Sequence, residues 1–510
     1  MVSTAVALGL TIAVLVGFTV IGLWYSRRRV GTVEDLITAR NSTGTGRTTA
    51  TLVASVMGVW ILLAAPEAGA SFGIAAVVGY AIGEALPMLA YSRVGPRIRE
   101  VIPNGHSLTE YAHARYGTAM YAFVLLVSCL YMFVFLAAEL TGIAGALSLV
   151  AGVPQWQTAV LVGGFVLLYT SYGGLRASIF TDSIQALLVL PLLVIAFAGA
   201  IVSLGGAGEI HDGITATNPS LLDPGFVPGL QFGLALAFAI LGAELINQLW
   251  WQRIYAAEDG RTVERGFRNA TIANGLIVFL AGLFGLVAAG SADIVTDVTS
   301  SAYNADIAFF VLLQTAFPEW IVLAVVLIAL LLVMSSVDTL FNALSSIVTA
   351  DLPRLLSDPD DRSLKLGARL LTIVVAVSAI YVSLRARSVL RLFFLADLLG
   401  AAVAFPLLYG LYSERLTGTG ALASSVLGLA VGLAYFPDFA GLLRSIPVLG
   451  GLLPAADPLY LTAFGGAFLV STVGTLVAAQ LFAGEYDHGE LTTEIQQLDE
   501  PTTDGGEVRD

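Results

Sequence analysis

The sequence predicts an all-α polytopic membrane protein with about thirteen transmembrane helices. Of its 510 residues, 57% are hydrophobic and only 12% are charged, and the mean hydropathy is +0.85. Apolar runs of about 20 residues, the length at which a helix crosses a bilayer, recur along nearly the whole chain. This composition excludes an ordinary soluble enzyme and predicts one membrane domain over residues 1–483.

Each expected span is an apolar run bounded by polar or glycine-rich residues. In chain order the spans are 3–25, 48–73, 75–95, 119–148, 156–173, 177–204, 229–254, 267–290, 318–348, 364–386, 388–411, 416–435 and 458–483. The first run is too long for the core of a signal peptide and lacks a cleavage site, so we expect it to be retained. Residues 484–510 are polar and acidic, which predicts a disordered cytoplasmic tail.

The basic residues predict how the chain is oriented in the cell membrane, because Lys and Arg gather in cytoplasmic loops. With the amino terminus outside, six cytoplasmic loops hold nineteen of the twenty-four Lys and Arg residues. Arg385, Arg387 and Arg391 would lie outside, as a local exception. An odd number of spans then places the carboxyl terminus in the cytoplasm.

Several classes of function are excluded by composition. The net charge of −13 argues against nucleic-acid binding, and Cys129, as the sole cysteine, provides neither a disulfide nor a thiolate cluster. The four histidines are scattered and no GxxxxGK[ST] motif occurs, so we expect no cofactor, no enzyme and no ATP-driven transport. Ion gradients remain as the energy source. Lys365 is the only lysine against twenty-three arginines, which, with the acidic excess, suggests adaptation to high salt.

Seven acidic residues fall within the expected spans, whereas no Lys or Arg lies well inside them. Ionisable groups at this depth are costly and therefore mark functional sites. A cavity lined by carboxylates and hydroxyls favours a cation, although some of these acids could simply pair with buried hydroxyls or amides. The seven are Glu67, Glu84, Glu139, Asp182, Glu244, Asp338 and Asp397.

Adjacent hydroxyls stand inside the apolar stretch LLVMSSVDTLFNALSSIVTAD at 331–351. Polar groups in lipid must find a partner, so Ser335 and Ser336 suggest a cation site. The alternative is that these serines bond to carbonyls of their own helix or join two helices.

The span at 48–73 is interrupted by Gly58, Pro66 and Gly69, which predicts a broken helix. Such a helix offers free backbone carbonyls at the membrane midplane, where transporters bind cations. Close packing of small residues between helices is the competing interpretation. Trp60 beside the break would provide an aromatic face for a small solute.

Two further clusters carry polar groups at the ends of spans. Gly173-Gly174 permits a tight turn, after which Asp182 could line an ion exit path or complement a helix amino terminus. The cluster at 247–253, NQLWWQR, ends a span with amides and aromatics that could face a solute or anchor the helix at the interface.

These segments resemble the sodium/solute symporter family over about residues 30–430. GGLRASIFTDSIQ at 173–185 is similar to the family's GGL-A-x-TD-x-Q signature. The helix SSVDTLFNALSSIVTADL, which begins at Ser335, is the other most specific piece of the resemblance. WWQRIYAAED at 250–259 resembles a QR-containing helix end, and HSLTEYAHARYG at 106–117 resembles the loop before the fourth helix. The resemblance implies sodium-coupled symport of a small organic solute by alternating access.

The resemblance also implies a five-plus-five inverted-repeat core of the LeuT type. Repeat one would cover about 48–204 and repeat two about 229–411, with peripheral helices at 3–25, 416–435 and 458–483. Sodium would be held by the carbonyls of Ala54, Met57 and Leu332 and by the hydroxyls of Ser335 and Ser336. Asp182 would lie on the inward sodium route.

The expected solute pocket is less well defined. At Val56 the family carries an acid or an amide, and Gly58 replaces a hydroxyl residue, so no particular solute carries over. Urea, proline-like amino acids and short carboxylates rank equally. The residues expected to bind the solute are Val56, Trp60, Glu84, Glu244, Asn247 and Trp250.

Alternative functions stay open from the sequence. A proton-coupled symporter on the same fold would use Asp182, Glu84 or Glu244 as carrier. A transporter-like membrane sensor would need a separate signalling partner, and an intramembrane hydrolase would need a nucleophile and base that the sequence does not suggest. The oligomeric state is not predicted.

Overall fold

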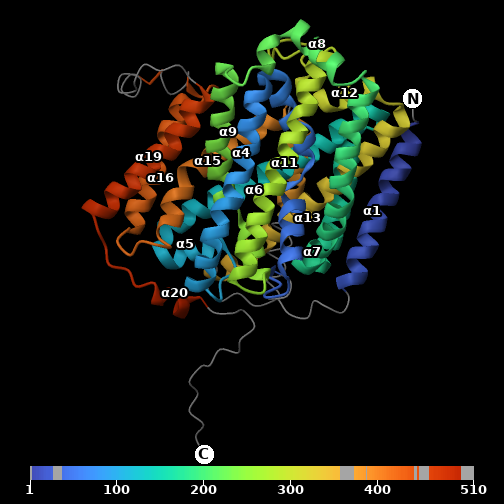
Figure 1. The fold of residues 1–510 in the computed structure, drawn as a ribbon. Helices are drawn as coiled ribbons and strands as arrows, with labels where there is room; N and C mark the ends of the chain where they lie inside the picture. Colours follow the sequence, from blue (N-terminus) through green and yellow to red (C-terminus); the bar gives the residue numbers. More distant parts are fainter. Residues whose placement is uncertain are drawn as a thin grey trace, which may run out of the picture.

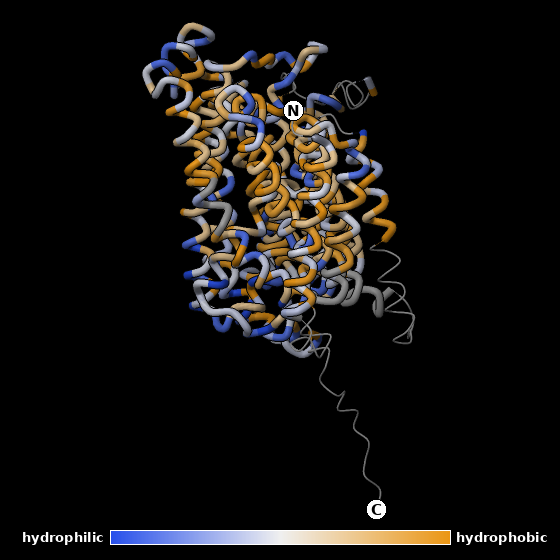
Figure 2. Tube along the Cα trace, turned by 90° about the vertical axis from the view of Figure 1, so that its right-hand side faces the viewer, coloured by the Kyte–Doolittle hydropathy of each residue, from blue (hydrophilic) through white to orange (hydrophobic). Residues whose placement is uncertain are grey.

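The computed structural model describes residues 3–26, 37–355, 373–385, 388–440, 445–446 and 459–495. Its helices lie side by side in a bundle, with the first described residues at one end and the last described helix, Gly489–Glu494, at the other (Figure 1). Hydrophobic residues fill the middle of the bundle and hydrophilic residues gather at its two ends (Figure 2). This distribution is that of a protein which crosses a membrane.

Eleven long helices form the bundle in the described part of the chain. They are α1 Thr4–Ser26, α3 Thr45–Val56, α4 Ala64–Val101, α6 Thr118–Ala151, α7 Gln155–Ser203, α9 Val227–Leu245, α11 Gly260–Ser291, α13 Glu319–Leu355, α15 Val389–Tyr409, α16 Gly418–Tyr435 and α19 Tyr460–Leu481. Shorter elements connect or extend them: η1 Val59–Leu62, α5 Leu108–Tyr116, α8 Ala207–Thr217, η2 Pro219–Leu222, α10 Gln248–Ala256, η3 Ala305–Ile307, α12 Ala308–Ala316 and α20 Gly489–Glu494. The expected all-α membrane class is confirmed, and within the described residues nine helices are long and apolar enough to span a bilayer by themselves.

Two long helices each cross the boundary between two expected spans at a glycine. α4 turns sharply at Gly73 (φ +71°) and α7 at Gly174 (φ +55°), conformations that residues with a Cβ rarely adopt. The spans expected to end at 73 and 173 therefore end where the chain reverses. The count of thirteen stays a prediction, because the span at 364–386 lies partly outside the described residues, which include a short apolar helix at Ile373–Ser383.

Two helices are broken near their middle. α3 ends at Val56 and the helix resumes with η1 at Val59, as the glycine and proline pattern indicates. The second break, between α9 and α10, lies at Ile246-Asn247 and is not signalled by glycine or proline. There the Asn247 side chain caps α10 by accepting a hydrogen bond from the backbone N–H of Leu249 at 3.0 Å.

The expectation of disorder is wrong for the first part of the tail. Residues 484–495 lie against α5 and include the short helix α20, with Leu491 and Ile495 buried. The Tyr486 hydroxyl donates to the carbonyl of Ala114 at 3.3 Å, and its ring stacks under the guanidinium of Arg115. The buried side chains of Leu491 and Ile495 hold this segment against the bundle. The acidic composition of the segment did not indicate this. Residues 496–510 lie outside the described part.

Replacement of Gly73 by alanine is expected to destabilise the protein by about 1–3 kcal/mol, because positive φ is strained for residues with a Cβ. The added Cβ would also lie 2.3 Å from the carbonyl oxygen of Leu221. The thermal unfolding midpoint of the detergent-solubilised variant measures this loss. Gly164→Ala is the matched control, because a Cβ at Gly164 meets no atom within 4 Å. Equal midpoints for the two variants would contradict the requirement for glycine at 73.

Candidate functional site

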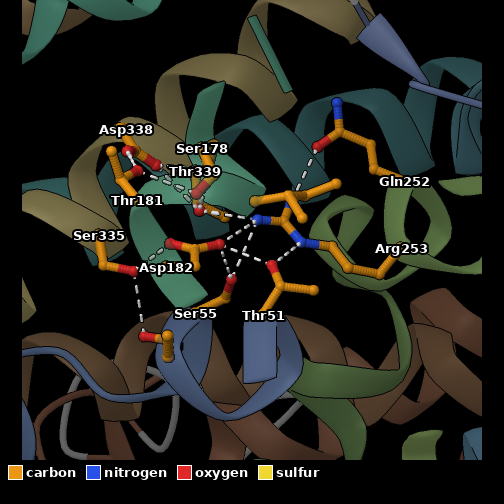
Figure 3. A network of polar contacts seen from close by, with 12 residues as sticks. Thr51, Ser55, Ser178, Thr181, Asp182, Gln252, Arg253, Ser335, Asp338 and Thr339 are labelled. Carbon is orange, nitrogen blue, oxygen red and sulfur yellow. Dashed lines mark hydrogen bonds and ion pairs between the residues drawn. The ribbon is translucent and has the colours of Figure 1, made fainter. Parts of the chain in front are cut away.

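A buried carboxylate joins three helices in the middle of the bundle. Oδ1 of Asp182, on α7, accepts a hydrogen bond from Ser335 of α13 at 2.5 Å, and Oδ2 accepts one from Thr51 of α3 at 2.6 Å (Figure 3). Ser55, one turn after Thr51, donates to Oδ2 at 3.4 Å. Asp182 has no exposed surface, so these hydroxyls replace the water that a carboxylate needs.

The partner of this carboxylate is Arg253, which is also fully buried. One guanidinium nitrogen, Nη2, lies 3.4 Å from Oδ2 of Asp182 and donates to Ser55 at 3.0 Å and to Thr339 at 2.9 Å (Figure 3). The expectation that no Lys or Arg lies well inside the spans is wrong for Arg253, which was placed at the end of the span 229–254 and is fully buried. It lies on α10, the helix that resumes after the second break.

Asp338 of α13 provides a second carboxylate on the other side of the same cluster. It accepts hydrogen bonds from Ser178 at 2.6 Å, from Thr181 at 3.4 Å and from Thr339 at 3.2 Å. The hydroxyl oxygen of Thr339 in turn accepts a hydrogen bond from Arg253. The single guanidinium is therefore connected to both carboxylates, which leaves the cluster with one more negative than positive charge when all three groups are ionised.

The residues expected to hold sodium lie at the edge of this cluster. The hydroxyl of Ser335 donates to the carbonyl of Ala54 at 3.3 Å, so the broken helix and α13 meet where the ion was expected. Ser336 is 1% exposed, and its hydroxyl has no hydrogen-bond partner among the described residues. Met57 and Leu332 are buried and both line a second, apolar cavity. Their roles as sodium ligands stay predictions.

A cavity lies on the other side of the broken helix. It is lined by Val56, Trp60, Tyr80, Glu84, Tyr131, Phe135, Leu236, Ile240, Glu244, Trp250, Leu390, Phe393 and Asp397. Five of the six residues expected to bind the solute are in this lining. The sixth, Asn247, is instead a support: its amide donates to Oε2 of Glu244 at 3.1 Å.

The cavity brings together three carboxylates from three helices: Glu84 of α4, Glu244 of α9 and Asp397 of α15. Glu244 accepts hydrogen bonds from Tyr131 at 2.5 Å and from the indole nitrogen of Trp250 at 2.6 Å. No arginine or lysine of the described residues lines this cavity. Carboxylates framed by aromatic rings are suited to organic ammonium groups, which gain ion pairing and cation–π attraction together.

Sequence reasoning identified Asp397 as a membrane acid but did not assign it to the pocket. The aromatic residues Tyr80, Tyr131, Phe135 and Phe393 were also missed. The helices that carry them are buried on most sides, so apolar periodicity does not reveal which face meets a cavity. The one available signal was that three acids recur in separate spans.

Two broken helices beside a buried ionic cluster and a cavity lined by carboxylates and aromatic rings define a secondary transporter, in which irregular backbone is tolerated because it lines a binding site. The fold is that of the LeuT-type transporters. A sodium-coupled sialic acid symporter of known structure aligns with a TM-score of 0.74 at 18% identity, over 94% of this chain and 99% of that one.

The sequence model of the Sodium:solute symporter family matches residues 36–428, and the chain belongs to this family. The spermidine transporter DUR31 of Candida albicans is 28% identical over 468 residues, which are 88% of this chain and 85% of that protein. The sodium/proline symporter of Escherichia coli is 26% identical over 437 residues, covering 81% and 84% of the two chains.

Removal of the buried guanidinium by Arg253→Ala is expected to destabilise the protein by about 3–5 kcal/mol, because Asp182 would remain buried without its cationic partner. A fall in the thermal unfolding midpoint measures the loss. Arg93→Ala is the control: its pair with Glu264, at 3.3 Å, leaves the arginine side chain 79% exposed, and its removal is expected to have no measurable effect. A midpoint unchanged by Arg253→Ala would show that the pair does not stabilise the bundle.

Proposed function

We propose that the protein is a sodium-coupled symporter of a small organic amine that carries one or more ammonium groups. The observation that supports this substrate most strongly is the cavity with three carboxylates, aromatic walls and, among the described residues, no cationic lining group. The Candida albicans relative, named for spermidine transport, agrees with this chemistry. A short carboxylate would meet repulsion from all three acids, whereas urea and proline-like amino acids stay as alternatives for the experiment to exclude.

The proposed sodium site consists of the carbonyls of Ala54, Met57 and Leu332 and the hydroxyls of Ser335 and Ser336. Two observations support it. The Ser336 hydroxyl is buried without a partner among the described residues, and a buried polar atom in that state is costly unless a ligand completes it. The Ser335 hydroxyl contacts both the Ala54 carbonyl and Asp182, so an ion there would have a carboxylate close by.

The proposed cycle couples the two sites through the broken helix. Sodium binding from outside would order the end of α3 against α13. This ordering would fix Val56 and Trp60, which form part of the wall of the cavity that contains Glu84, Glu244 and Asp397 (the amine cavity). The two repeats then rock and open both sites to the cytoplasm. Because each ligand would favour the same closed state, each would raise the affinity of the other by an equal factor, typically worth about 1–3 kcal/mol.

We also propose that the amino terminus faces outward and the carboxyl terminus faces the cytoplasm of the cell that carries this protein in its membrane. Arg97, Arg99 and Arg115 contact the segments at the end of the bundle that holds α5 and α20, opposite the start of α1 (Figure 1). Basic residues favour the cytoplasmic side.

Uptake into proteoliposomes tests the function. We expect an inward sodium gradient to drive accumulation of labelled putrescine or spermidine, while a potassium gradient of equal ionic strength does not. Urea, proline and acetate, tested in parallel, are expected to accumulate less. Accumulation driven only by an imposed proton gradient would overturn sodium coupling, and sodium-driven accumulation of urea or proline alone would overturn the amine assignment.

A matched pair of variants ties the result to the cavity. Asp397→Asn removes one of the three carboxylates and is expected to raise the KM for putrescine about tenfold or more, the size of a lost charge-assisted contact. Glu264→Gln, on the exposed side of α11, removes an equal charge outside the cavity and is expected to leave KM unchanged.

The sodium site makes a separate prediction. Ser336→Ala is expected to raise the sodium concentration for half-maximal uptake about tenfold, with a smaller effect on amine affinity at saturating sodium, because it removes one ligand of the ion. Ser425→Ala is the control, since Ser425 is also fully buried but bonds only within its own helix α16, to Ala421 at 2.9 Å. Equal losses of sodium and amine affinity in Ser336→Ala would contradict the assignment.

A further inference from the structure

A fourth buried carboxylate lies at the break of the first broken helix. Glu139, on α6, is fully buried and stands one turn beyond Phe135, which lines the amine cavity. Its Oε2 accepts the backbone N–H of Val59 at 2.8 Å, and the backbone N–H of Trp60 lies toward the same carboxyl group. These are the first free donors of the helix that resumes after the break.

The carboxyl group of Glu139 lies directly against the unwound backbone. A Cβ built on Gly58 would lie 1.8 Å from Oε1 and 2.4 Å from Cδ, so only glycine leaves room for it. The carboxyl group is therefore packed into the break from the side of α6, and its Oε1 has no hydrogen-bond partner among the described residues.

The break also forms part of the wall of the amine cavity. Val56 and Trp60 stand on its two sides and both line that cavity. The indole nitrogen of Trp60 donates to the carbonyl of Val56 at 2.8 Å, which holds the two sides together. In transporters with broken helices, the N–H groups at such a break bind the anionic group of the substrate. Here the protein's own side chain already bonds them.

We infer that Glu139 is a specificity-determining residue: its carboxylate takes the place that a substrate carboxylate would occupy at Val59 and Trp60. A solute that carries its own carboxylate, such as an amino acid, finds these donors taken and a negative charge beside them. The corresponding amine without a carboxylate meets neither obstacle. This inference rests on the proposed amine transport and deepens it, because it gives the reason why amines are chosen over amino acids.

Two pairs of solutes that differ only by a carboxylate test the inference. Putrescine is ornithine without its carboxylate, and cadaverine is lysine without it. In the wild-type protein we expect sodium-driven uptake to prefer the amine of each pair strongly. In Glu139→Ala, which frees the N–H of Val59 and removes the charge, the ratio of ornithine to putrescine uptake (kcat/KM) is expected to rise about tenfold or more.

Two further variants keep the experiment decisive. Glu139→Gln retains an acceptor for the Val59 N–H and an equal volume, so it preserves the break if the alanine variant does not fold. It removes only the charge, so a smaller rise in the same ratio is expected. Thr141→Ala, which alters a partly buried hydroxyl on the same helix that bonds to the Ala137 carbonyl, is expected to leave the ratio unchanged.

The two proposals fail in different ways. If the wild-type protein accumulates putrescine but the ratio is unchanged in Glu139→Gln and in every folded alanine variant, Glu139 only supports the backbone and the inference is overturned. If the wild-type protein accumulates neither amine under a sodium gradient, the amine function itself is overturned, and with it the reason given for Glu139.

Discussion

Backbone that is unwound inside a membrane must still find hydrogen-bond partners, and most of this structure follows from that constraint. The first break exposes the carbonyl of Ala54 and the N–H of Val59. Ser335 donates to the carbonyl and Glu139 accepts from the N–H. At the second break Asn247 caps the resumed helix. Each partner comes from a helix or turn whose position is thereby fixed, so the breaks organise the bundle around them.

The buried charges divide into two groups with different roles. At the ionic cluster, Asp182 and Asp338 share the guanidinium of Arg253 and are surrounded by hydroxyls. In the cavity, Glu84, Glu244 and Asp397 lie together, and no cationic side chain of the described residues is among the lining groups. A carboxylate that already pairs with a cationic side chain of the protein gains little free energy from a cationic ligand. A carboxylate without such a counter-charge gains most from binding one. This contrast separates the structural charges from the proposed binding charges.

The sequence predicted more of the fold than of the site. Hydrophobic runs located the spans, and glycines at 73 and 173–174 marked two of their ends, because sharp reversals require residues without a Cβ. The break at Ile246-Asn247 carries neither glycine nor proline, so local chemistry did not reveal it. The burial of Arg253 was not predicted either, and this arginine lies on the helix that resumes after the same break. Glu139 was identified as costly, but its contact with Gly58 depends on how α6 packs and is not encoded by spacing.

The short segment from Ala54 to Trp60 explains how the two proposed ligands can act on one another without a long pathway. Its first residue contacts Ser335 beside the proposed ion site, and its last lines the amine cavity. Between them the backbone is unwound and is held from the opposite side by Glu139. An ion that orders Ala54 would therefore also restrict the position of Trp60, which lies six residues along the same short segment. If sodium and the amine both favour one arrangement of this segment, each raises the affinity of the other by the same factor.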